Sequence, residues 1–166
     1  AADGWLGIAM PEEYGGAGLG ITEAALMMQT ISESGAGMQG ASAVHMNIFG
    51  LHPVVLHGTE EQKKRFLARL IAGKEKSCFA VTEPNTGLDT TRLKTKATRE
   101  GNRYRIDGQK IWISSGEHDF TDNIIHLVLA RIEGAPAGIK GISLFVVPKV
   151  FVNDDGSLGE RTEGAA

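Results

Sequence analysis

Apolar residues recur at helical spacing in the first part of the chain and at the alternating spacing of strands afterwards. The pattern predicts a helix from Thr22, which can cap it, to about Ser34. A second, weaker helical region runs from Gly40 to His57. Pro53 is expected to divide this region in two, because proline has no backbone N–H to donate within a helix.

The third predicted helix has the clearest boundaries. Thr59 and Gln62 have the spacing of a capping box at its start, and Gly73 is expected to end it. Its buried stripe is expected to consist of Phe66, Leu67, Leu70 and Ile71. On the solvated face, ion pairs four residues apart are expected between Glu60 and Lys64 and between Glu61 and Arg65.

Strand patterns follow from Lys76 onward. The predicted strands are Ser77–Thr82, Leu93–Arg99, Arg103–Ile106, Lys110–Ser114, Asn123–Ile132 and Gly141–Val147. Glu100-Gly101-Asn102 and Asp107-Gly108 are hairpin signals. After Pro148 the sequence is polar and turn-like, and no closing apolar element is expected.

This order of elements predicts an α+β fold, in which a helical part precedes a mostly antiparallel β part. The change of period near Gly73–Lys76 predicts a helical domain at residues 1–75 and a β-domain at residues 76–166.

Composition narrows the class of protein. Hydrophobic and charged fractions of 42% and 22% are ordinary for a soluble globular protein. A net charge of −3 gives no electrostatic indication of binding to nucleic acid or to an anionic membrane surface. No apolar run approaches the roughly 18 residues that a membrane span needs. The first residues also lack the basic and apolar regions of a signal peptide.

The single cysteine and three of the histidines do not fit a catalytic or metal-binding pattern. Cys78 is the single cysteine, so no internal disulfide can form, an intracellular compartment is favoured, and we expect a buried structural thiol. His45, His52 and His57 are seven and five residues apart, which does not fit the usual spacing of helical metal ligands. We therefore expect no metal site.

The stretch from Cys78 to Ser115 carries the candidate chemistry. Two short apolar patterns, Phe79–Val81 and Ile111–Ile113, bracket a turn-rich segment and a polar hairpin. Such a segment can place backbone N–H groups, hydroxyls and one large aromatic side chain around a flat ligand.

Four motifs of this sequence resemble the flavoprotein acyl-CoA dehydrogenase family. They are FAVTEPNTGLDT at Phe79–Thr90, GQKIWISS at Gly108–Ser115, PEEYGGAGLG at Pro11–Gly20 and GTEEQKKRFL at Gly58–Leu67. The resemblance implies an N-terminal helical domain, a middle β-domain shaped as a partial barrel, and flavin adenine dinucleotide (FAD) as cofactor. The family's C-terminal helical bundle is absent from this sequence.

The resemblance also implies roles for individual residues. Phe79, Val81 and Thr82 match the strand end that contacts the flavin, where the Val81–Thr82 backbone and the Thr82 hydroxyl bond the pyrimidine edge. Trp112 would pack against the ring system, with Ile113 beside it, and Ser114 would approach flavin N5. Preorganised donors of this kind stabilise the negative charge of a reduced flavin.

Two positions depart from the family, and one is Asn85, which stands where a small residue is more usual. Leu88 stands where a small hydroxyl residue commonly contacts both flavin and acyl-CoA, so only its backbone N–H can serve substrate binding. The family's catalytic base is a glutamate of the C-terminal bundle. Neither Glu83 nor Glu117 matches that glutamate by position in the motif.

The expected function is therefore part of an oxidoreductase of fatty acid metabolism that converts an acyl-CoA to a trans-2-enoyl-CoA. The resemblance implies an electron-transfer flavoprotein as electron acceptor and a homotetramer as the full-length assembly. The expected compartment is the cytoplasm, or the mitochondrial matrix in a eukaryote. Two alternatives stay open, an acyl-CoA oxidase with the same flavin platform and a non-catalytic fragment or module.

Overall fold

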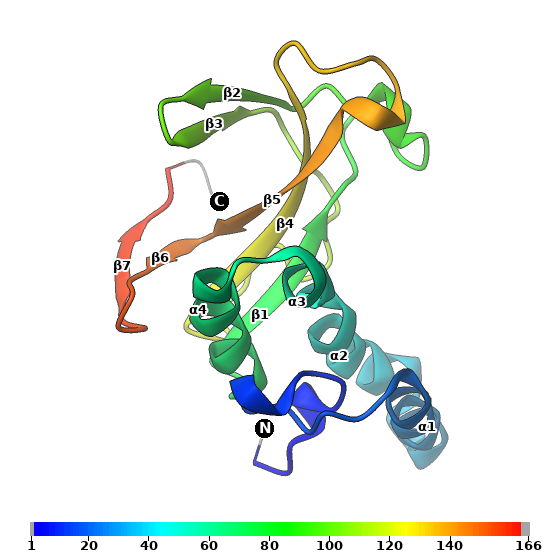
Figure 1. Cartoon of the computed structure of the whole chain (residues 1–166). Helices are drawn as coiled ribbons and strands as arrows, with labels where there is room; N and C mark the ends of the chain where they lie inside the picture. Colours follow the sequence, from blue (N-terminus) through cyan, green and yellow to red (C-terminus); the bar gives the residue numbers. More distant parts are fainter. Residues whose placement is uncertain (1, 164–166) are drawn as a thin grey trace.

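The computed structural model describes residues 2–163, which form a helical part lying against a mixed β-sheet (Figure 1). The helices are α1 (Ile21–Ile31), α2 (Gly37–Gly50), α3 (His52–His57) and α4 (Glu60–Ile71). The strands are β1 (Glu75–Ala80), β2 (Lys96–Glu100), β3 (Arg103–Asp107), β4 (Asn123–Ile132), β5 (Ile142–Pro148), β6 (Val150–Val152) and β7 (Leu158–Arg161).

The predicted first helix is present, but its N-cap differs from the prediction. Gly20, not Thr22, is the N-cap, and its backbone N–H donates to the Glu23 carboxylate at 2.9 Å. At the other end, a π-helical turn at Ser32–Ala36 leads from α1 into α2. Gly35, at φ 86°, makes a kink in this turn. Gly37 also leaves the helical backbone, at φ 58°, so the glycines break the helical path between α1 and α2, as the sequence pattern indicated.

The division of the second helical region at Pro53 and the start of the third helix at Thr59 are confirmed. Helix α2 ends before Leu51, and Pro53 lies in the first turn of α3, where its missing N–H costs little. At the start of α4, the Thr59 hydroxyl accepts from the Gln62 N–H at 3.3 Å. The Gln62 side chain accepts from the Thr59 N–H at 2.9 Å in return, which completes the capping box.

The ion pairs predicted on α4 are wrong. Glu60 pairs with Lys63 at 3.0 Å and also accepts a hydrogen bond from the Tyr14 hydroxyl at 2.6 Å. Arg65 pairs with Asp154, in the turn between β6 and β7. Glu60 thus pairs with a neighbour three residues along the helix where four were expected, and Arg65 takes a tertiary partner.

Strand β4 organises the sheet. It pairs in parallel with β1 over Asn123–Val128 and antiparallel with β5 over Ile125–Arg131. Its last two residues pair in parallel with the start of β2, and β3 forms an antiparallel hairpin with β2. A strand has two edges, so β1 and β2 share one edge of β4 while β5 occupies the other.

Three expectations about the β part are wrong. Residues 110–114 form no strand, because Trp112 has a left-handed φ of 55° that breaks the extended pattern. The Asp107-Gly108 pair accordingly starts an irregular segment and makes no hairpin. After Pro148 the chain is not merely turn-like, since β6 and β7 form a two-stranded antiparallel sheet there.

The main core joins the helices to the sheet. Its buried residues are Met10, Tyr14, Leu51, Val54, Phe66, Leu67, Leu70, Ile71, Ile125, Leu127 and Val152. The predicted stripe of α4 is thus confirmed, and it packs against alternate residues of β4. Helix α2 lies so close to β1 that a Cβ on Gly50 would come within 1.7 Å of the Ser77 hydroxyl oxygen.

Replacing Leu67 by alanine is expected to lower the free energy of unfolding by about 3 kcal/mol, because the side chain is 0% exposed and leaves a cavity. Chemical denaturation measures the change. Leu26→Ala is the matched control, since Leu26 is also helical but 58% exposed, and should cost less than about 0.5 kcal/mol. Equal losses in the two variants would contradict this account of the core.

Candidate functional site

A hollow of about 220 Å³ lies where α2, the end of β1 and the segment after Lys110 meet. We call it the Trp112 hollow. Its lining residues are Met46, Phe49, Phe79, Thr82, Trp112, Ile113 and Ser114. Five residues that the sequence indicated as flavin contacts, from two segments about thirty residues apart in the chain, therefore surround one space.

Aromatic rings form one side of this hollow. Phe79 of β1 stacks on Phe49 of α2, with ring centroids 5.2 Å apart and planes 4° from parallel. His45 also stacks on Phe49, with ring centroids 4.3 Å apart. Trp112 stands apart from this stack and is 88% exposed, so its indole presents apolar area that no described residue covers.

Polar groups around the hollow are available to a ligand. Within residues 2–163, the Thr82 hydroxyl, the Trp112 indole N–H and the Ser114 hydroxyl have no hydrogen-bond partner. The hollow therefore combines an open aromatic face with three uncommitted donors. That combination suits a flat heteroaromatic ligand, which offers a stacking surface and polar edges.

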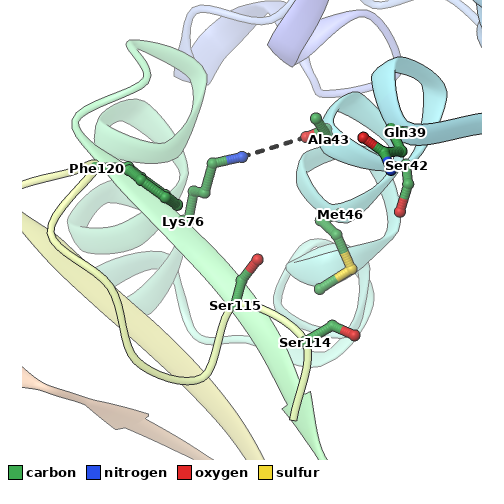
Figure 2. A pocket seen from close by; sticks show the side chains of 8 residues that line it. All are labelled: Gln39, Ser42, Ala43, Met46, Lys76, Ser114, Ser115 and Phe120. Carbon is green, nitrogen blue, oxygen red and sulfur yellow. Dashed lines mark hydrogen bonds between the residues drawn. The ribbon is translucent and has the colours of Figure 1, made fainter. Parts of the chain in front are cut away.

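A second hollow of about 420 Å³ adjoins the first and shares Met46 and Ser114 with it. Its lining residues are Gln39, Ser42, Ala43, Met46, Lys76, Ser114, Ser115 and Phe120 (Figure 2). Figure 2 shows Met46 pointing from α2 toward Ser114. The Lys76 ammonium donates to the Ala43 carbonyl at 3.3 Å, which links β1 to α2 at the edge of this space.

A buried carboxylate directly follows Thr82, just beyond the end of β1. Glu83 is 5% exposed and accepts four hydrogen bonds, from the Thr95 N–H at 3.0 Å, the Thr95 hydroxyl at 2.5 Å, the Lys94 N–H at 2.8 Å and the Lys110 ammonium at 3.0 Å. Burial alone would raise the pKa of Glu83, but these hydrogen bonds outweigh it and lower the pKa to about 2.

Two other candidate residues lie outside the Trp112 hollow. Val81 does not line it, and the Val81 carbonyl accepts a hydrogen bond from Lys110 at 3.1 Å. Leu88 is fully exposed and lines neither hollow, so its role in substrate binding stays a prediction. Glu83 and Glu117 are both held in ion pairs, with Lys110 and Lys149 respectively.

Sequence reasoning missed the contribution of α2. Met46 and Phe49 are three residues apart, so they lie on one helical face, and that spacing was the available signal. Nothing local in the sequence shows that this face meets β1. Gln39 and Ser42 carry the same face toward the second hollow.

The structure also shows the environment of Cys78 and the arrangement of possible metal ligands. Cys78 is fully buried, as predicted, and burial raises the pKa of its thiol to about 12. Among residues 2–163 no group of three His, Cys, Asp or Glu side chains is arranged to hold a metal ion. Over the same residues, no helix is long and apolar enough to span a membrane.

Comparison with known proteins gives a consistent result. The family model described as "Acyl-CoA dehydrogenase, N-terminal domain" matches residues 1–74, and "Acyl-CoA dehydrogenase, middle domain" matches residues 78–163. The chain is 35% identical over 159 residues to 3-methylmercaptopropionyl-CoA dehydrogenase of Ruegeria pomeroyi. It is 36% identical over 146 residues to mitochondrial isovaleryl-CoA dehydrogenase of Pongo abelii.

These matches cover most of this chain but a minor share of each relative. They include 95% and 88% of this chain, against 27% and 34% of the two relatives. A crystal structure of an acyl-CoA dehydrogenase complexed with FAD from Bacillus anthracis is similar at a TM-score of 0.74 and 34% identity. That match covers 89% of this chain and 24% of the other. The chain thus spans about a quarter to a third of the length of these proteins.

Glu83 is expected to make stability depend on acid. Its pKa is about 2 in the fold, below the usual range, so its contribution is present above about pH 5 and is lost toward about pH 2. The loss for this one group is about 3 kcal/mol in the free energy of unfolding. Denaturant titrations at a series of pH values should show that Glu83→Gln removes much of this slope.

The matched control is Glu100→Gln. Glu100 also pairs with a cation, Arg105, at 2.8 Å, but both side chains are more than half exposed. An exposed pair contributes less than about 1 kcal/mol, so the acid dependence should stay close to that of the unmodified protein. A Glu83→Gln variant with the full acid slope would show that Glu83 is not the responsible group.

Proposed function

This chain belongs to the acyl-CoA dehydrogenase family, and we propose that its Trp112 hollow is one wall of an FAD site in an enzyme that oxidises acyl-CoA. The observation that carries the proposal is the shared space beside Thr82, Trp112 and Ser114. These residues come from the two motifs that the sequence shares with the family. The proposed division is a helical domain at residues 1–75 and a β-domain at residues 76–166.

The residues present fit such a ligand. The exposed indole of Trp112 can cover a flat ring system and keep water from it, with Ile113 and Phe79 extending the apolar wall. The hydroxyls of Thr82 and Ser114 have no partner in the described part of the chain and can bond polar edges of the ring. FAD, when bound, supplies the two-electron acceptor for conversion of an acyl-CoA to a trans-2-enoyl-CoA.

The proton of the acyl α-carbon needs a base, and the glutamates near the hollow do not fit that task. Glu83 already accepts four hydrogen bonds and Glu117 is paired with Lys149. We therefore place the base outside these 166 residues, in a segment that would complete the flavin site. An electron-transfer flavoprotein as electron acceptor, a homotetramer and a cytoplasmic or mitochondrial-matrix compartment belong to the same proposal.

The full-length protein tests this function directly. It should purify with the visible absorbance of flavin, and an acyl-CoA added without oxygen should bleach that absorbance. Oxygen consumption during turnover would favour the acyl-CoA oxidase alternative, because the two enzyme types differ in how oxygen reaches the reduced flavin. A protein that takes up no flavin under any loading condition would favour the non-catalytic module.

Replacing Trp112 by alanine in the full-length protein is expected to weaken FAD binding about tenfold, because the variant loses a stacking surface of about 1 kcal/mol or more. Titration of flavin-free protein, followed by flavin fluorescence, measures the affinity. Trp112→Phe should recover part of the loss.

Trp5→Ala is the control, since Trp5 is about half exposed but lines neither hollow. Its affinity for FAD should stay unchanged. Equal losses at Trp5 and Trp112 would mean that the effect is general destabilisation, and the hollow would lose its assignment.

A further inference from the structure

A buried ion pair lies behind the strand end that borders the Trp112 hollow. Glu83 and Lys110 are 3.0 Å apart, and their side chains are 5% and 12% exposed. Neither residue lines the hollow itself. Burying two charges is costly unless both are paired and further hydrogen-bonded. The other three hydrogen bonds of Glu83 and the second hydrogen bond of Lys110 meet that requirement. The surrounding structure therefore stabilises both charges of the pair.

Lys110 acts on the peptide group that leads into Thr82. Its ammonium donates to the Val81 carbonyl at 3.1 Å, and this carbonyl shares one peptide unit with the Thr82 N–H. A cation that bonds the carbonyl polarises the peptide and strengthens its N–H as a donor. The next peptide is fixed as well, because the Thr82 carbonyl accepts from the Ile111 N–H at 3.0 Å.

The same contacts hold the other wall of the hollow. Ile111 directly precedes Trp112, whose left-handed backbone turns the chain toward Ser114. Glu83 ties this arrangement to Lys94 and Thr95 at the start of β2. The strand end at Thr82 and the loop at Trp112 are therefore anchored to each other through two adjacent residues, Lys110 and Ile111.

We propose that Glu83 and Lys110 are a positioning pair that fixes the Val81–Thr82 peptide against the Trp112 loop and sets the electrostatic potential that a bound flavin meets there. The electrostatic half of this inference, which is the effect on the potential at a bound flavin, rests on the proposed FAD site. Its geometric half rests on contacts within this chain alone. Lys110 contributes positive charge behind the Thr82 N–H, and Glu83 balances that charge while it holds Lys110 in place.

The reduction potential of the flavin-loaded, full-length protein tests the electrostatic half. Positive charge near a flavin favours its reduced, more negative state. Glu83→Gln leaves Lys110 unbalanced and should raise the potential, whereas Lys110→Met removes the cation and should lower it. Each shift should reach at least a tenfold change in the ratio of oxidised to reduced flavin, about 30 mV for two electrons.

The direction of the two shifts separates charge from loosened structure. Loosening of the Thr82 peptide alone would move both variants the same way, and that result would overturn the electrostatic half. Equal potentials in both variants and the unmodified protein would overturn it too. Lys110→Arg, which keeps the charge, should return the potential toward that of the unmodified protein. The exposed pair supplies the controls, and Glu100→Gln and Arg105→Met should leave it unchanged.

Amide hydrogen exchange tests the geometric half without any flavin. The Ile111 N–H, which bonds the Thr82 carbonyl, should exchange at least tenfold faster in Glu83→Gln and Lys110→Met than in Glu100→Gln. Unchanged exchange at Ile111 would overturn the positioning role. Faster exchange at Ile111 in a protein that binds no flavin would uphold the positioning role while the proposed function fails. Each half therefore has a readout of its own.

Discussion

The pairing of β4 is the constraint on which the rest of the structure depends. One edge of β4 carries β5, and the other edge carries β1 first and then β2. The chain between Ala80 and Lys96 must therefore leave this edge and return to it a few residues further along. The turn-rich segment is the loop that results. Glu83 closes the loop by accepting hydrogen bonds from Lys94 and Thr95, just before β2 begins.

Much of the fold could be predicted because the deciding signals are local. The capping box of α4 and its buried stripe follow from residues within one helix, and the largely apolar sequence of β4 accompanies burial of residues on both of its faces. The pairing of Arg65 with Asp154 and of Glu60 with the Tyr14 hydroxyl could not be predicted, because Asp154 and Tyr14 lie outside α4. The same limit applies to β6, whose three apolar residues are too few to show a period, and to β7, whose four residues are all exposed.

In the candidate site, too, some residues could be predicted from local sequence and others depend on tertiary contacts. Thr82, Trp112 and Ser114 could be chosen from motif resemblance, and they do share one hollow. The pattern around Trp112 nevertheless indicated a strand, because alternation of apolar and polar residues does not reveal a left-handed backbone at one position. Met46, Phe49 and Lys110 were missed for a different reason, since their importance arises only when α2 and the segment after β3 fold against β1.

The backbone at Trp112 has a consequence for how this protein can change. A bulky residue with φ of 55° is held in a conformation that costs about 1–2 kcal/mol and that glycine would adopt freely. A glycine there would relieve that strain but remove the indole from the hollow. At this position glycine would therefore favour stability, whereas tryptophan favours ligand recognition. Engineering for heat resistance by relaxing strained backbone should leave residue 112 alone and look for gains elsewhere in the chain.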